Sequence, residues 1–238
     1  MIKNILKKIG LNKTSAWKQC AKLKASYVQR KIDKKMHGYM QLYGLEALDK
    51  IYKIFKTNNV NIWFEYGTLL GAYREKGFIP YDYDIDLGMY SEDYTPELER
   101  ELFDAGFSIK RMFYKVENLH PSTKCLTEIS LDYKGLQIDV FFYWKENENR
   151  IGYVYTGVLG DSYAKKNIYA VRTSLLPVAN IDEVDFLGIK FGMPSNTKDC
   201  LKKLYGDTFM TPLKNSSYTQ SKECIPYTKL YGEMYGAW

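Results

Sequence analysis

An alternation of acidic and apolar side chains in the first half of the chain constrains the fold more than any other feature. Asp82, Asp84 and Asp86 occupy every second position, and Ile85 and Leu87 fall in the alternate phase. A period of two predicts an extended strand with the carboxylates on one face and the apolar residues on the other. Two carboxylates about 5 Å apart repel by roughly 3 kcal/mol at an effective dielectric near 20. The row therefore predicts a bound cation, and closely spaced carboxylate oxygens are typical of Mg²⁺ sites for phosphoryl transfer.

The same spacing also fits the first ligands of a calcium-binding EF-hand. That loop needs glycine at its sixth position and glutamate at its twelfth, where this chain has Leu87 and Asp93. Because of this mismatch and the alternating apolar residues, a strand is favoured over a calcium-binding loop.

Composition narrows the class of protein. At 238 residues with 45% apolar residues, the chain can bury the core of one domain. It has no apolar run near the roughly 20 residues that span a bilayer, and its start does not have the pattern of a secretory signal. Four scattered cysteines without a Cys-x-x-Cys pair, and only two histidines, exclude a zinc site of usual spacing and give no disulfide framework. We therefore expect reduced thiols in a cytoplasmic protein.

Positive charge is concentrated at the N-terminus. Residues 1–35 contain eleven Lys or Arg and one acidic residue, a net charge of +10, while the whole chain carries +6, so residues 36–238 carry −4. Residues 2–9 have the spacing of a short basic amphipathic helix, which either lies on an anionic membrane surface or docks on the domain. We expect residues 1–35 to be an arm that meets an anionic surface at the inner membrane face, and no nucleic-acid groove across the domain.

Hydrophobic periodicity predicts one α/β domain over residues 36–238. The expected helices are residues 14–36, 39–57, 69–74, 95–105 and 196–205. The expected strands are residues 60–66, 82–90, 107–114, 126–133, 136–143 and 151–156, with a hairpin around Gly188. Residues 157–180 give no clear pattern, and an irregular segment is expected after residue 214.

A further acidic residue, Asp139, stands in an apolar strand segment. Ile138 and Val140 fall on one face of this strand, so Asp139 points to the other. A lone aspartate among apolar neighbours is costly to bury unless it is paired or bound to a metal. Asp139 is therefore a candidate partner for the aspartate row, the alternative being hydrogen bonds from a neighbouring loop.

Gly67 and Thr68 follow one predicted strand and precede a short predicted helix. Backbone N–H groups at such a turn can hold phosphate oxygens, and the threonine hydroxyl adds a donor. Arg74 could place its guanidinium near the same phosphates. Alternatively, Arg74 forms a surface ion pair with Glu75 or Glu92.

A local basic cluster interrupts the acidic part of the chain. Lys165, Lys166 and Arg172 belong to it, and we take Lys166 and Arg172 as candidate ligands for the phosphates of a donor or an acceptor. The alternative is a solvated basic patch with no binding role. Sequence alone does not choose between these interpretations.

Three segments of the chain resemble the LicD family, which also includes the fukutin-related proteins. They are the run from Gly67 to Met89, Ile-Asp-Val-Phe at residues 138–141, and Met-Pro-Ser-Asn at residues 193–196 with further matches up to residue 212. The family often has Ile-Pro-Trp-Asp-Asp-Asp-Ile-Asp in the first segment, where this chain has Tyr81 and Tyr83 in place of Trp and the middle Asp. These departures leave the choice of donor and acceptor open.

The resemblance implies a nucleotidyltransferase-like α/β fold, a mixed sheet flanked by helices with added C-terminal helices. It also implies transfer, dependent on Mg²⁺ or on Mn²⁺ in its place, of a phospho-alcohol such as phosphocholine from a CDP-linked donor to a hydroxyl of a cell-surface glycan, with release of CMP. Family donors carry choline or ribitol, and acceptors include teichoic acids, capsules, lipopolysaccharides and glycoproteins. The family's metal-binding aspartates map to Asp84, Asp86 and Asp139, with Asp139 as a further ligand or as the base.

Two other functions remain open at this point. A nucleotidyltransferase of the same fold would transfer NMP from an NTP, and a non-catalytic glycan- or membrane-binding module would use the aromatic residues and the basic arm. The repulsive carboxylate row argues against a pure binding module. The basic arm also fits an acceptor that is linked to a lipid.

Overall fold

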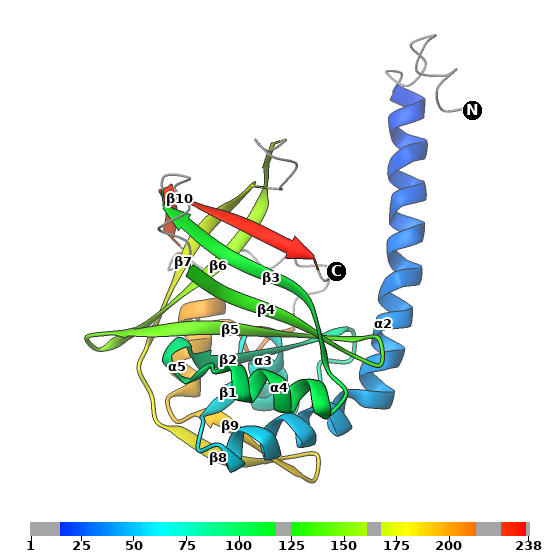
Figure 1. The fold of residues 1–238 in the computed structure, drawn as a ribbon. Helices are drawn as coiled ribbons and strands as arrows, with labels where there is room; N and C mark the ends of the chain where they lie inside the picture. The colour runs from blue at the N-terminus through cyan, green and yellow to red at the C-terminus, as the bar shows by residue number, and fades with distance from the viewer. Residues whose placement is uncertain (1–14, 118–124, 161–167, 213–224, 237–238) are drawn as a thin grey trace.

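The computed structural model describes residues 15–117, 125–160, 168–212 and 225–236 (Figure 1). Its helices are α2 (Ser15–Thr57), α3 (Tyr66–Arg74), the 3-10 helix η2 (Ser91–Asp93), α4 (Pro96–Asp104) and α5 (Thr197–Tyr205). Its strands are β1 (Ile62–Phe64), β2 (Asp84–Tyr90), β3 (Ser108–Glu117), β4 (Cys125–Tyr133), β5 (Leu136–Glu146), β6 (Asn149–Gly160), β7 (Ile168–Pro177), β8 (Ile181–Phe186), β9 (Ile189–Pro194) and β10 (Ile225–Gly236).

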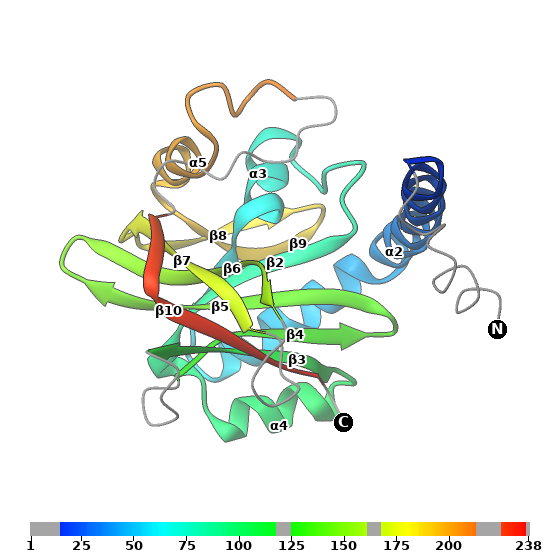
Figure 2. The same ribbon diagram turned by 90° about the horizontal axis from the view of Figure 1, so that it is seen from above.

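Eight strands form one mixed sheet in the order β1-β2-β5-β4-β3-β10-β7-β6, and β8 and β9 form a separate hairpin. The sheet curls, because β5 also pairs with β6. Helices α2 and α4 cover one side of the β2–β5–β4 region, while α3 and α5 lie on the other side (Figures 1 and 2). The expected fold class, a nucleotidyltransferase-like mixed sheet flanked by helices, is confirmed.

The pairing of β2 with β5 places the site. These strands are parallel, and their apolar residues Ile85, Leu87, Ile138 and Val140 are all buried in the main core. The period-two prediction is thus confirmed from Asp84 onward, whereas the strand begins two residues later than expected. Side chains of the opposite phase point away from this core, toward the side that carries α3.

The two helices expected over residues 14–36 and 39–57 form one continuous helix, α2. In its second half Met40, Leu48 and Ile51 enter the core, while Leu23, Tyr27 and Ile32 in the first half are exposed. The first half of α2 extends away from the domain (Figures 1 and 2). No helix among the described residues is both long enough and apolar enough to cross a membrane.

The expectation of an irregular C-terminal segment is wrong. Residues 225–236 form β10, which pairs with both β3 and β7 and completes the curled part of the sheet. Residues 168–177, which gave no clear sequence pattern, form β7 between β10 and β6. Both partners of β10 lie far from it in the sequence, so local periodicity gave little indication of these pairings.

Candidate active site

The structure brings the three predicted metal ligands together. Asp84 and Asp86 come from β2 and Asp139 from β5, with Asp86 directly opposite Asp139 in the parallel register. One carboxylate oxygen from each residue lies within 4.8 Å of the other two. Because alternate residues of β2 share a face, this pairing places all three carboxylates on the side of the sheet away from the α2 and α4 core.

The turn before α3 holds the carboxylate strand in place. The backbone N–H of Gly67 donates to Oδ2 of Asp86 at 3.1 Å, and the N–H of Asp86 donates to the Thr68 hydroxyl at 2.8 Å. A Cβ on Gly67 would lie 2.9 Å from the Asp82 carboxylate, so a larger residue would displace that side chain. Gly67 and Thr68 are therefore part of the site, and they contact the carboxylate strand itself.

Asp139 combines burial with an incomplete set of partners. Its exposed fraction is 8%, and Gln137 on the same strand donates to its Oδ2 at 2.8 Å. Its Oδ1 is buried and has no hydrogen-bond partner among the described residues. A buried carboxylate oxygen without a partner is costly. Oδ1 of Asp139 is therefore available to bind a cation or a proton.

Burial raises the pKa of every carboxyl group in the cluster, and repulsion from neighbouring carboxylates adds to the shift at Asp84 and Asp86. Burial, followed by the charges of Asp82 and Asp139, raises the pKa of Asp84 to about 8. Burial and the charges of Asp84 and Asp139 raise the pKa of Asp86 well above its usual range. Burial also raises the pKa of Asp139, against the opposing influence of Ser130, Gln137 and Arg111. The protein alone does not neutralise these groups, so the donor set fits a divalent cation that prefers oxygen ligands.

Asp82 lies at the edge of the cluster and stabilises the turn before β2. Its carboxylate accepts from the N–H of Tyr83 at 3.1 Å, and its backbone carbonyl lies 2.9 Å from Nδ1 of His37 on α2. Burial raises the pKa of Asp82, and a hydrogen bond with Asp84 opposes this shift. Asp82 thus adds negative charge next to Asp84 without joining the group of three.

Arg74 lies at the opposite end of α3 from Gly67. Seven residues at 1.5 Å per residue separate the two by about 10 Å along the helix. The guanidinium of Arg74 donates to Glu75 at 2.7 Å and to the carbonyl of Phe209 at 3.1 Å. Of the two interpretations of Arg74, the ion pair with Glu75 is the one that the structure contains. The hydrogen bond to the Phe209 carbonyl ties α3 to the segment after α5.

Of the two remaining predicted phosphate ligands, only Arg172 lies in the described part of the chain. Lys166 lies outside the described residues. Arg172 lies in β7, opposite Val154 of β6, and β7 borders β6 and β10 and does not border β2 or β5.

A buried ion pair next to the turn was not predicted. Arg150 of β6 contacts Glu65 at 3.0 Å, and both side chains are almost completely buried. Glu65 also accepts from Trp63 at 2.8 Å and is the N-cap residue of α3, two positions before Gly67. A glutamate between an apolar strand and a Gly-Thr turn was the available sequence signal, but its partner lies 85 positions further along the chain. The pair fixes the start of α3 and hence the Gly67 contact.

Fold and site together define an α/β domain of the nucleotidyltransferase type with a three-carboxylate cluster. The family model for the LicD/FKTN/FKRP nucleotidyltransferase domain matches residues 59–196, more than half of the chain and all three cluster residues. The chain therefore belongs to the LicD family, as the sequence motifs predicted.

Several known proteins match parts of the chain. The protein named ribitol-5-phosphate transferase FKTN from Mus musculus is 30% identical over 179 residues, which are 74% of this chain and 35% of that protein. The protein named ribitol 5-phosphate transferase FKRP from Homo sapiens is 50% identical over 48 residues, which are 20% of this chain and 10% of that protein. An uncharacterised protein of Rickettsia typhi is 26% identical over 133 residues, 56% of this chain and 38% of that protein. The chain thus spans about a third of the length of the FKTN relative.

Proposed function

We propose that this protein is a divalent-metal-dependent phosphotransferase that moves a phospho-alcohol from a CDP-linked donor to a hydroxyl group of a glycan and releases CMP. One observation carries the proposal. The three carboxylates of Asp84, Asp86 and Asp139 converge within 4.8 Å inside the segment that matches the LicD family. The names of the FKTN and FKRP relatives favour ribitol phosphate as the transferred group, with phosphocholine and glycerol phosphate as the other donors to test.

Asp84, Asp86 and Asp139 are the residues that would hold Mg²⁺, or Mn²⁺ in its place. A divalent ion bound there would supply positive charge to the phosphates of the donor and offset the negative charge that develops during transfer. The raised pKa of Asp84 and the unpartnered Oδ1 of Asp139 support this assignment. A bound cation would offset the repulsion that adds to burial in raising the pKa of Asp84 and would give Oδ1 of Asp139 a partner.

The residues of the chain itself would orient the reactants and handle the proton. Gly67 and Thr68 hold Asp86 in position through two hydrogen bonds. In the transfer, the acceptor hydroxyl forms a new P–O bond to the phosphorus that bears the alcohol, the P–O bond to CMP breaks, and the hydroxyl proton must leave. Oδ1 of Asp139 is the unpartnered atom that would either bind the cation or accept this proton.

CMP release tests the proposal directly. The purified protein is incubated with Mg²⁺, a glycan acceptor and, in turn, CDP-ribitol, CDP-choline and CDP-glycerol. We expect CMP to appear with one of these donors, and Asp84→Asn to lower the rate at least 100-fold, as expected for loss of a charged group at the reacting phosphate. Asp104→Asn, an exposed aspartate at the end of α4, is the matched control and should react at the wild-type rate. Near-normal turnover by folded Asp84→Asn protein contradicts the proposal.

The same assay distinguishes the proposed phosphotransferase from a second candidate function. A nucleotidyltransferase that moves NMP from an NTP is supported by the description of the matching family domain. That reaction releases pyrophosphate and leaves the nucleotide on the acceptor, whereas the proposed reaction releases CMP. Pyrophosphate release from an NTP, together with no CMP from any CDP-linked donor, would replace the first function with the second.

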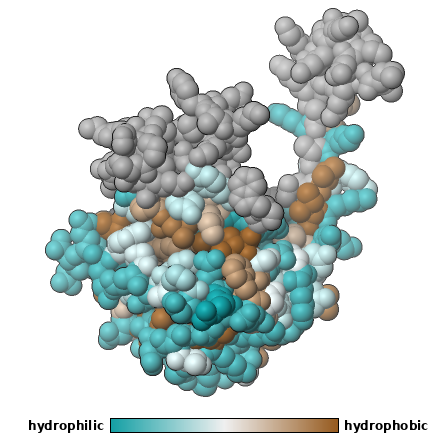
Figure 3. Space-filling view, in the orientation of Figure 1, coloured by the Kyte–Doolittle hydropathy of each residue, from teal (hydrophilic) through white to brown (hydrophobic). Residues whose placement is uncertain are grey.

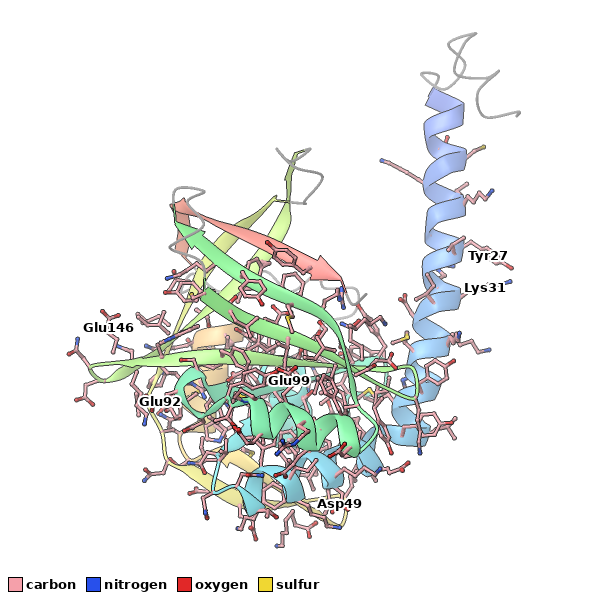
Figure 4. The ribbon with its side chains drawn as sticks, in the orientation of Figure 1. Tyr27, Lys31, Asp49, Glu92, Glu99 and Glu146 are labelled. Carbon is pink, nitrogen blue, oxygen red and sulfur yellow. The ribbon has the colours of Figure 1, made fainter. Side chains whose placement is uncertain are left out.

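We further propose that the arm of residues 1–35 meets an anionic membrane surface, where a lipid-linked acceptor would be presented. The described part of this arm is the projecting half of α2, where Tyr27 and Lys31 lie side by side with Nζ 4.9 Å from the ring centroid (Figure 4). Leu23 and Ile32 are exposed on the same part, and brown apolar side chains lie among hydrophilic ones there (Figure 3). The net positive charge of this arm would attract it to an anionic lipid surface, where its exposed apolar side chains would add contacts.

A liposome assay tests this second proposal. The full chain should sediment with vesicles that contain anionic lipid and remain in solution with vesicles of neutral lipid alone. The double variant Leu23→Ser, Ile32→Ser and a deletion of residues 1–35 should both lose sedimentation while activity on a soluble acceptor is kept. Persistent binding after the deletion refutes the role of the arm.

A further inference from the structure

Four polar side chains form one lateral row across four adjacent strands. Asp86 of β2 is opposite Asp139 of β5, Asp139 is opposite Ser130 of β4, and Ser130 is opposite Arg111 of β3. Directly opposed residues of neighbouring strands point to the same face of a sheet. The carboxylate cluster thus continues sideways into a hydroxyl group and a guanidinium group.

An irregularity in β3 turns Arg111 to this face. Ile109 is opposite Leu131, but Arg111 is opposite Ser130, so β3 has one extra residue at this point. Ile109 and Met112 both pack against the apolar core although they are three positions apart, which regular alternation does not allow. A β-bulge re-aims the following side chain. Without it, Arg111 would share the face of Ile109 and point into the core.

The buried atoms of this row lack partners. Oγ of Ser130, Nε of Arg111 and Oδ1 of Asp139 are all buried and have no partner at full hydrogen-bond geometry among the described residues, although the Ser130 hydroxyl lies close enough to Asp139 to lower the pKa of that carboxyl group against the larger effect of burial. Ser130 is completely buried, and no ion pair joins Arg111 to a carboxylate in the described part of the chain. Burial raises the pKa of both Asp139 and the buried Glu128, and the positive charge of Arg111, acting at longer range, only partly opposes this rise. Donors left unpaired at the edge of a carboxylate cluster point to a ligand that supplies acceptor oxygens.

We propose that Arg111 and Ser130 form a phosphate subsite beside the carboxylate cluster. This inference rests on the proposed function for its setting, a substrate with phosphate groups near Asp86 and Asp139. The phosphate belongs either to the diphosphate of the donor or to a phosphate already carried by the acceptor. Both sources present the same oxygens to Arg111.

The spacing of the sheet suits this arrangement. Strands lie about 4.8 Å apart, so the Cα atom of Arg111 is about 10 Å from that of Asp139, two strand spacings away. A phosphate near the carboxylates would therefore lie between them and the guanidinium. Arginine presents planar N–H donors that match phosphate oxygens, and such charge-assisted hydrogen bonds are stronger than neutral ones. In the transfer, a guanidinium at this place would share the negative charge of the reacting phosphate.

Binding of inorganic pyrophosphate in the presence of Mg²⁺, measured by isothermal titration calorimetry, tests the subsite without turnover. Arg111→Gln should weaken this binding by roughly 10- to 100-fold, the range expected for loss of a charged hydrogen-bond donor. Ser130→Ala should weaken it by roughly two- to tenfold with little loss of stability, because the lost hydroxyl makes only a weak contact with Asp139. The affinity for Mg²⁺ alone should stay the same or rise in Arg111→Gln, because a cation near Asp139 is removed.

Lys110→Gln is the matched control, since it removes the same charge from the neighbouring residue. Lys110 occupies the bulge, pairs with Asp132 at 3.8 Å and is about half exposed. Wild-type pyrophosphate affinity is expected for this variant. An equal loss of affinity in Lys110→Gln and Arg111→Gln would overturn the subsite in favour of a general charge effect. Unchanged affinity in both Arg111→Gln and Ser130→Ala would also overturn it.

Kinetics then identify the source of the phosphate. If the donor supplies it, Arg111→Gln raises the KM for the donor or lowers kcat with every acceptor. If the acceptor supplies it, only acceptors that carry a phosphate are affected. Failure of the proposed function is a separate outcome, in which the wild type releases no CMP from any CDP-linked donor while its pyrophosphate binding still depends on Arg111.

Discussion

Replacing Asp84 with Asn should stabilise the metal-free protein and abolish its stabilisation by Mg²⁺. The reason is that Asp84 lies in a cluster of like charges that the chain does not neutralise. Burial and the charges of Asp82 and Asp139 raise its pKa to about 8. An aspartate whose pKa is raised in the folded state contributes stability that is complete below its unfolded pKa, near 4, and is lost as the pH rises through about 8. Asparagine carries no charge at any of these pH values, so it avoids the loss.

The size of the effect follows from the distances. Carboxylate oxygens of Asp84, Asp86 and Asp139 lie within 4.8 Å of one another. At an effective dielectric near 20, one such pair repels by about 3.5 kcal/mol. Protons retained by the cluster reduce the repulsion below pH 8. We therefore expect Asp84→Asn to raise the free energy of unfolding by about 2–4 kcal/mol at pH 9, and by less at pH 5.

Urea denaturation in EDTA at pH 5 and pH 9, repeated with Mg²⁺ at pH 9, measures these differences. Mg²⁺ at 100 times its dissociation constant should stabilise the wild type by about 2.7 kcal/mol and the variant very little. The exposed control Asp104→Asn should change stability by less than about 1 kcal/mol at either pH and respond to Mg²⁺ like the wild type. Two results would refute the reasoning: no gain in stability for Asp84→Asn at pH 9, or equal stabilisation of the wild type and the variant by Mg²⁺.

Three further predictions concern the surroundings of the cluster. Mg²⁺ affinity should rise by up to about tenfold per pH unit between pH 6 and 8, because bound Mg²⁺ must displace protons from carboxyl groups of raised pKa. Calorimetry in buffers of different ionisation enthalpy would detect the released protons, and their absence would contradict the raised pKa values. Arg74→Met should lower the free energy of unfolding by about 1–3 kcal/mol, because the contacts with Glu75 and Phe209 are lost. The affinity for pyrophosphate in the presence of Mg²⁺ should stay unchanged, and weaker binding would support Arg74 as a phosphate ligand. Glu65→Gln should lower the free energy of unfolding by about 3–5 kcal/mol in a urea titration, because it leaves the charge of Arg150 buried without a carboxylate. A loss below about 1 kcal/mol would argue against a structural role for the ion pair.

Local periodicity predicted the parts of the fold that depend on neighbours in sequence. The alternation from Asp84 to Leu87 predicted which face of β2 is buried, and the isolated Asp139 in an apolar segment predicted a partner for the aspartate row. The parallel pairing that places Asp86 opposite Asp139 is a long-range contact, and for it the sequence offered only the family resemblance.

What local periodicity missed depends on partners far away in the chain or on irregular backbone. β10 packs between two strands that occur much earlier in the sequence, so the stretch after residue 214 had no local signal of its pairing. Arg111 was hidden by the bulge in β3, because regular alternation assigns it to the wrong face. Arg74 had the right chemistry for a phosphate ligand, but the length of α3 and the carbonyl of Phe209 place it elsewhere.

The two faces of β2 and β5 explain how a fold can retain a cluster that opposes its own folding. Ile85 and Leu87 are completely buried on the core face, one position away from the aspartates. Full burial of one such side chain contributes about 1.5–3 kcal/mol, so two of them offset one repulsive carboxylate pair of about 3.5 kcal/mol. Because a period of two ties both sets of residues to the same strand, the core cannot form in this register without bringing the carboxylates together. The apolar face thus maintains the repulsion between the ionised carboxylates, which protons relieve below pH 8 and a bound cation would relieve above it.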